Sequence, residues 1–169
     1  VPYAWTRLVL HALAAAGVAR LALALRRSAL QAGVAGLVMA ATPLAFTPLY
    51  WAAGIQDLLA VACAVWALVL WSGPGSWRAG GAVVLAAGAV FAKETVVGLP
   101  LIMLLLALWG PRPRRDASRW WGPALVAGAA ALATALALGG FDTGADQPYA
   151  LGDGWVVLGH LLTYEIGRA

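Results

Sequence analysis

The stretch Ala79–Trp109, AGGAVVLAAGAVFAKETVVGLPLIMLLLALW, decides the fold because a Lys-Glu dipeptide interrupts it near its middle. The apolar runs on either side, Ala79–Ala92 and Val96–Trp109, are each about 21 Å long as helices, against about 30 Å for the hydrocarbon core of a bilayer. Charges buried in a membrane are costly, so they are usually paired and often functional. We therefore predict a helical hairpin with Lys93 and Glu94 at its tip, just below the membrane surface.

The composition is that of an integral membrane protein. Of the 169 residues, 63% are hydrophobic and 11% are charged, against about 25% charged residues in an average soluble domain. The net charge of +4 does not indicate nucleic-acid binding, because the basic residues fall in short connections, where they set topology. We expect a bacterial inner (plasma) membrane protein.

The fold class predicted is all-α, a polytopic transmembrane helix bundle of about six spans that forms a single domain over residues 1–169. A seventh, partial helix is expected over Trp155–Ile166. Trp51 and Trp71 flank the third span about 30 Å apart, the separation of two interfacial aromatic belts. The six expected spans are Trp5–Leu25, Ser28–Phe46, Ile55–Trp71, Ala79–Ala92, Val96–Trp109 and Trp120–Leu138.

The charges alternate between connections. Arg26, Arg78 and Arg114 fall in every second connection, and the others carry Asp57 or the Lys-Glu dipeptide. The positive-inside rule places the arginine connections in the cytoplasm. A hairpin at the dipeptide satisfies this rule, whereas one continuous helix over Ala79–Trp109 does not. The first span then starts outside, so we expect at least one helix upstream of it and further helices downstream, which makes the chain an internal fragment.

The outer turn before the third span holds several candidate residues. Asp57 is either a helix-start residue, favoured there by the helix dipole, or a ligand group. Trp51 is either a belt anchor or a platform for a sugar or a lipid, and Gln56 lies beside Asp57. His11 lies in the first span toward its outer end, where a hydrogen bond to a neighbouring helix is favoured over a role as a ligand.

Two motifs, in this order along the chain, resemble motifs of the GT-C class of polytopic glycosyltransferases. This class includes the protein O-mannosyltransferases and their bacterial relatives. The two motifs are Trp51-x-x-Gly54-x-x-Asp57-Leu-Leu and, about 35 residues later, Ala-Lys93-Glu94-Thr. The stretch Arg-Leu-Val-Leu-His11-Ala-Leu is similar to one in the second transmembrane helix of that family. The chain departs from many relatives in carrying Thr47 and the neutral pair Leu49-Tyr50 where they have His and an acidic residue.

The resemblance implies transfer of a sugar from a polyprenyl-phosphate donor to a protein, lipid or glycan acceptor at the extracytoplasmic face. Lys93, Glu94, Asp57, Trp51, Gln56 and His11 are the substrate-binding candidates. The catalytic carboxylate of the class lies in a loop expected upstream of Val1. Lys93 would stabilise the leaving phosphate, and Glu94 would hold Lys93 or contact the acceptor; alternatively, the dipeptide only caps two short helices.

Other functions remain open. Short, broken helices around a charged pair also describe transporter and flippase sites, and a non-catalytic membrane scaffold is the third reading. No cofactor is expected. His11, Asp57 and Glu94 all lie toward the outer side, so a divalent metal is conceivable, but no ligand spacing supports it.

Overall fold

The computed structural model describes residues 2–42, 54–111 and 117–139, and every regular element in these ranges is helical. The all-α class is therefore confirmed for the described residues. The chain divides into two units, residues 1–134 and 135–169, and nearly all of the described residues belong to the first. The elements are α1 (Pro2–Ala24), α2 (Ala29–Ala41), α4 (Ile55–Trp71), α5 (Ser76–Ala92), the 3₁₀ helix η3 (Glu94–Val96), α6 (Leu99–Trp109) and α7 (Ser118–Gly139).

Several helix boundaries differ from those expected; α1 begins at Pro2 instead of Trp5, and α7 begins at Ser118 instead of Trp120. The helix α2 ends at Ala41, with Thr42 extended, so the expected span to Phe46 is too long; the residues from 43 onward lie outside the described ranges. The helix α6 begins at Leu99 instead of Val96, because a 3₁₀ turn and Gly98 precede it. The helix α5 begins three residues early, at Ser76. The expected helix Ile55–Trp71 matches α4 at both ends.

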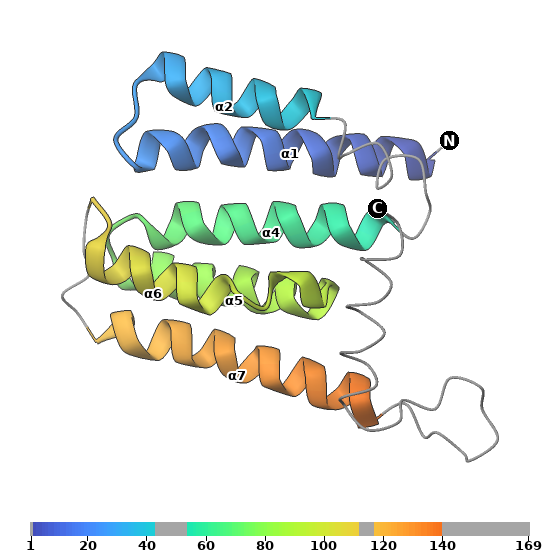
Figure 1. Ribbon diagram of the computed structural model, residues 1–169, viewed down its shortest axis with the longest axis vertical. Coiled ribbons are helices and arrows are strands. Elements are labelled where there is room, and N and C mark those ends of the chain that lie inside the picture. Colours follow the sequence, from blue (N-terminus) through green and yellow to red (C-terminus); the bar gives the residue numbers. More distant parts are fainter. Residues whose placement is uncertain (1, 43–53, 112–116, 140–169) are drawn as a thin grey trace, which may run out of the picture. The chain divides into compact units, whose positions relative to one another are not determined.

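Local chemistry explains the tight turn between α1 and α2. Arg26 adopts the left-handed conformation, with a φ of 61°, and the amides of Arg26 and Arg27 donate to the carbonyls of Leu23 and Ala22. This pattern of two hydrogen bonds terminates many helices. Ser28 then starts α2 with a reciprocal cap, in which its hydroxyl accepts from the amide of Gln31 at 3.2 Å. The two helices pack side by side in opposite directions (Figure 1).

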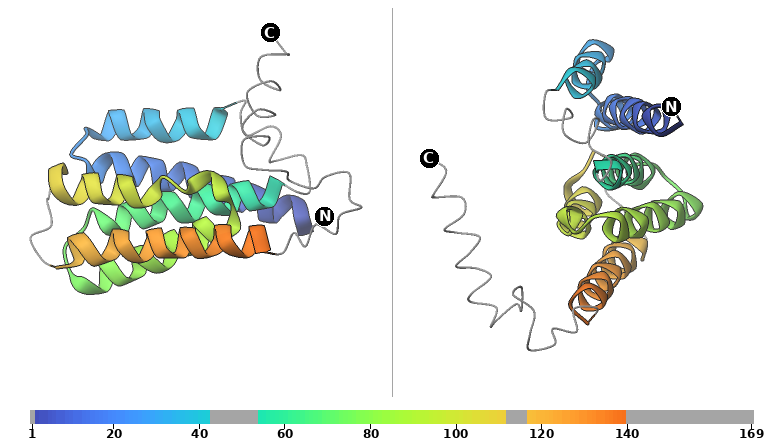
Figure 2. Two further views of the ribbon diagram at one scale, coloured as in Figure 1. Left: turned by 60° about the horizontal axis from the view of Figure 1, so that its bottom comes forward. Right: turned by 90° about the vertical axis from the view of Figure 1, so that its right-hand side faces the viewer.

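The helices of this unit alternate in direction, as Figures 1 and 2 show. The carboxyl ends of α1, α4 and α6 lie together, because residues at these ends line one common pocket. These residues are Ala24, Ser72 and Gly110. The turns to α2, α5 and α7 start from the same end. Lys93 and Asp57 meet at the opposite end. The expected hairpin is confirmed, because α5 stops at Ala92 and α6 returns in the opposite direction.

Two tryptophan side chains donate hydrogen bonds to main-chain carbonyls of neighbouring helices. Trp66 of α4 donates from Nε1 to the Leu13 carbonyl of α1 at 3.0 Å. Trp71 donates from Nε1 to the Met103 carbonyl of α6 at 2.6 Å and is only 2% exposed. Trp71 is therefore a core residue, and its expected role in an interfacial belt is wrong. Its ring lies against Gly122 of α7, where a side chain would collide with it.

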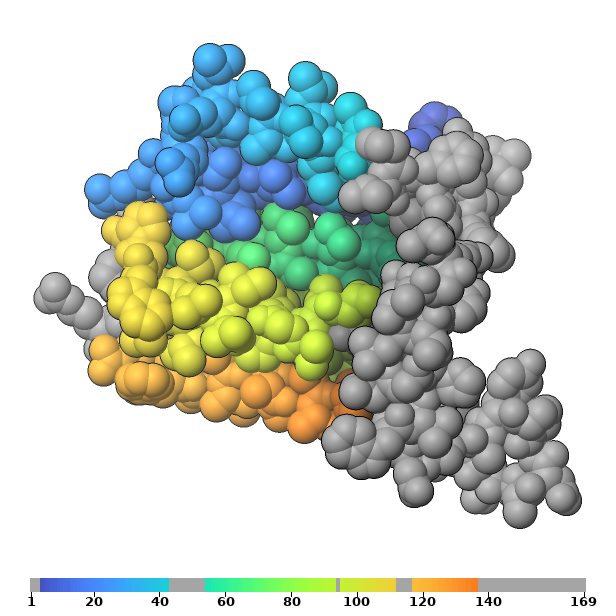
Figure 3. Space-filling model, viewed as in Figure 1, coloured from blue at the N-terminus to red at the C-terminus, as the bar shows by residue number. Residues whose placement is uncertain are grey.

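The flanks of the helices carry large apolar side chains that no described residue covers. On α2, Leu30, Leu37 and Val38 are 78%, 68% and 63% exposed, and α2 packs mainly on α1 at one edge of the array (Figure 3). Among the described helices, only α1, over Ala4–Ala24, is both long and apolar enough to cross a membrane. The helices α2, α4, α5 and α6 are apolar but shorter, with 10–17 residues each.

Candidate functional site

The candidate site is an ion pair between Asp57 and Lys93, two residues 36 positions apart in the sequence. The Nζ atom of Lys93 lies 3.5 Å from Oδ1 of Asp57. Asp57 stands in the first turn of α4, where a carboxylate is favoured by the helix dipole. Lys93 caps the end of α5 in an extended conformation, with its amide donating to the Ala89 carbonyl. Asp57 therefore lies at a helix start, one of the two roles expected for it from the sequence.

Both side chains of the pair remain accessible. The side chain of Lys93 is 28% exposed and that of Asp57 is 37% exposed. An ion pair with this exposure stabilises a fold by at most about 1 kcal/mol, so its contribution to folding is small. The ammonium can exchange the carboxylate for another anion at little cost, which makes this end of the array suited to hold an anionic group.

The remaining candidates at this end are placed only in part. Gln56 is exposed and lies next to Asp57 at the start of α4. Glu94 begins the 3₁₀ helix directly after Lys93, but its side chain lies outside the description. Trp51 lies outside the described residues altogether. The described partner of Lys93 is thus Asp57, a pairing that the sequence did not predict.

His11 is bound to a neighbouring helix and is not part of the ion pair. It is 7% exposed, and its Nε2 donates to the carbonyl of Ala40 in the last turn of α2 at 3.0 Å. Because a carbonyl only accepts, Nε2 carries the proton, and the buried Nδ1 has no hydrogen-bond partner. The bond satisfies one of the carbonyls that a helix end leaves unpaired. The expectation that His11 serves a neighbouring helix is confirmed.

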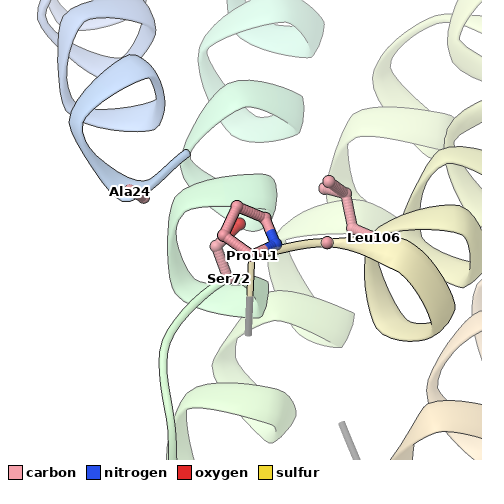
Figure 4. A pocket seen from close by; sticks show the side chains of 5 residues that line it. Ala24, Ser72, Leu106 and Pro111 are labelled. Carbon is pink, nitrogen blue, oxygen red and sulfur yellow. The ribbon is translucent and has the colours of Figure 1, made fainter. Parts of the chain in front are cut away.

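The pocket at the opposite end lacks the chemistry of a binding site. Its wall consists of Ala24, Ser72, Leu106, Gly110 and Pro111 (Figure 4). Its one side-chain polar group, the Ser72 hydroxyl, donates to the Leu68 carbonyl at 2.8 Å. Within the described part of the chain, no group of three His, Cys, Asp or Glu side chains is placed to hold a metal ion.

Comparison with protein-family models, with curated proteins and with solved structures yields no match to this chain. The resemblance to the GT-C class therefore stays a prediction, to be judged by the chemistry of the residues.

Proposed function

We propose that this chain is part of a membrane-embedded glycosyltransferase of the GT-C class that binds a polyprenyl-phosphate sugar donor at the end holding Asp57 and Lys93. The single observation that carries the proposal is the 3.5 Å ion pair. It joins the two segments on which the resemblance rests, the one around Asp57 and the one around Lys93, across 36 residues of sequence. A binding site assembled from both motifs needs this juxtaposition.

Membrane embedding is supported by where apolar and charged side chains lie. Leu30 and Leu37 of α2, Val84 of α5 and Leu101 of α6 are all at least 60% exposed, and water penalises such surfaces by about 25 cal/mol per Å². The helices α2 and α6 contain no charged residue. Helices of 17 residues, the length of α4 and α5, fall at the short end of the range of about 17–25 that crosses a bilayer.

The proposal gives each residue a role. When the bond between sugar and lipid phosphate breaks, negative charge develops on the phosphate oxygen, and the Lys93 ammonium is the group that stabilises it. Asp57 holds Lys93 in place before the donor binds. Gln56 supplies amide donors and an acceptor beside the pair. Glu94 contacts the acceptor, and the carboxylate that activates the acceptor is expected upstream of Val1.

Lys93→Ala in the full-length protein tests this role. Losing one contact to a developing anion costs about 2.7–4 kcal/mol in comparable sites, so we expect sugar transfer per folded molecule to fall by about 10²–10³. Lys93→Arg keeps the positive charge but should retain only part of the wild-type activity, because the planar guanidinium group of arginine does not replace the compact ammonium group of lysine. The transfer rate is normalised to the amount of folded protein, measured by size-exclusion chromatography.

The outcomes separate the alternatives. Normal transfer per folded molecule in Lys93→Ala rejects the donor-phosphate role. A lower yield of folded protein with unchanged specific activity identifies the pair as a purely structural cap. A transporter is the second candidate, favoured by the break between α5 and α6 at Lys93. It predicts uptake or flipping of a substrate without any transfer product.

A further inference from the structure

The end of the array opposite the ion pair carries two arginine–tryptophan pairs. The guanidinium of Arg78 lies 5.2 Å from the ring centroid of Trp77, and that of Arg119 lies 4.9 Å from the ring centroid of Trp120. Both separations are within the reach of about 6 Å of a cation–π contact. Trp77 is 71% exposed and Trp120 is 54% exposed. We call these four residues the arginine–tryptophan surface.

Positive charge at this end has no counter-charge among the described residues. The first turns of α5 and α7, where the two pairs lie, hold no acidic residue. Exposed Arg26 and Arg27 lie in the turn between α1 and α2 at the same end. The described acidic residues, Asp57 and Glu94, both lie at the opposite end. The connection formed by residues 112–116 lies outside the described residues; its sequence contains three arginines and one aspartate.

Stacking on an exposed ring also fixes how each arginine presents its charge. The indole of tryptophan places its apolar ring in the headgroup region and its N–H group toward water, and tryptophan is therefore enriched at membrane interfaces. The Arg78 guanidinium also lies close to the turn before α5, where a Cβ on Gly73 would collide with it. A guanidinium held in this way offers its fork of N–H donors to a phosphate in bidentate geometry.

From these observations we propose that the arginine–tryptophan surface binds the phosphate groups of anionic phospholipids in the leaflet that it faces. The lipid source follows from exposed apolar side chains at the same end of the helices, such as Trp109, which is 76% exposed at the end of α6. The inference rests on the membrane placement in the proposed function, but not on the sugar-transfer chemistry, because the two sites lie at opposite ends of the helices.

Lipid association measured by electron paramagnetic resonance tests the proposal. The full-length protein is reconstituted in phosphatidylcholine vesicles, and the motionally restricted fractions of spin-labelled phosphatidylglycerol and phosphatidylcholine are compared. We expect the wild type to prefer phosphatidylglycerol by about fivefold or more, the contribution of one basic residue near a charged surface. Arg78→Gln with Arg119→Gln should lower this ratio clearly, leaving the part that the other arginines at this end contribute, and raised salt should lower it too.

A single-charge comparison keeps the test specific. Arg7→Gln removes one half-buried arginine from the other end of α1, whereas Arg78→Gln removes one from the surface. Equal losses in these two variants, or no lipid preference in the wild type, overturn the proposal. A protein that fails to insert into vesicles overturns it together with the membrane placement. A lipid preference in a protein without transferase activity supports it and rejects only the proposed function.

Discussion

The packing of α7 against α4 gives the sharpest test of the fold, through Gly122→Ala. A Cβ at Gly122 would overlap Cη2 of the Trp71 indole and lie 2.7 Å from its Cζ3. Trp71 has little room to retreat, because it is 2% exposed and its Nε1 is bonded to the Met103 carbonyl at 2.6 Å. The added methyl group must therefore displace either the ring or the helix.

The magnitude follows from two opposing effects. Overpacking a filled site costs about 1–3 kcal/mol of the free energy of unfolding, whereas replacing glycine by alanine inside a helix gains about 0.5–1 kcal/mol. Gly128→Ala is the matched control on the same helix, because a Cβ there meets nothing within 4 Å. Gly122 precedes Pro123, so a Cβ there also meets the proline ring, and we expect Gly122→Ala to be less stable than Gly128→Ala by at least about 1–3 kcal/mol.

The measurement is the free energy of unfolding in mild detergent, followed by circular dichroism as denaturing detergent is titrated in. Trp71→Phe provides the second arm, since the smaller ring lacks the indole atoms that face Gly122. In this background the penalty of Gly122→Ala should shrink, which a double-mutant cycle measures as a coupling energy. Equal stability of the Gly122→Ala and Gly128→Ala variants would show that α7 does not pack on Trp71 in this way.

Two further predictions concern the first helices and the topology. His11→Leu should lower the free energy of unfolding by about 0.5–1.5 kcal/mol, because the Ala40 carbonyl loses its part-buried hydrogen bond; an unchanged value in the same titration would refute the stabilisation of α2 by this bond. In a background without the native cysteine, Cys63→Ala, cysteines placed at Ser28 and Thr95 should label from opposite sides of the membrane. Labelling from one side would contradict the alternating topology.

The sequence alone determined the helices, and the reason is local. Continuous apolar runs and the break around Lys93 act over a few residues, so their effects can be recognised without knowledge of the neighbouring helices. The alternation of charged connections likewise predicted the reversal between α5 and α6. The expected extension to Phe46 failed where Thr42 becomes extended, since an apolar composition does not mark the last helical residue.

The tertiary structure decided which side chains meet. Asp57 was expected either as a helix start or as a ligand group, but only folding brings it to Lys93, because the pairing depends on how α4 and α5 pack. Trp71 looked like a membrane anchor by its place at a helix end, yet Gly122 gives its ring a site in the core. Hydrophobic periodicity and composition indicate where a helix forms and how apolar it is, but not which neighbouring helix covers each of its faces. The packing of the helices determines the ion pair, the core and the arginine–tryptophan surface.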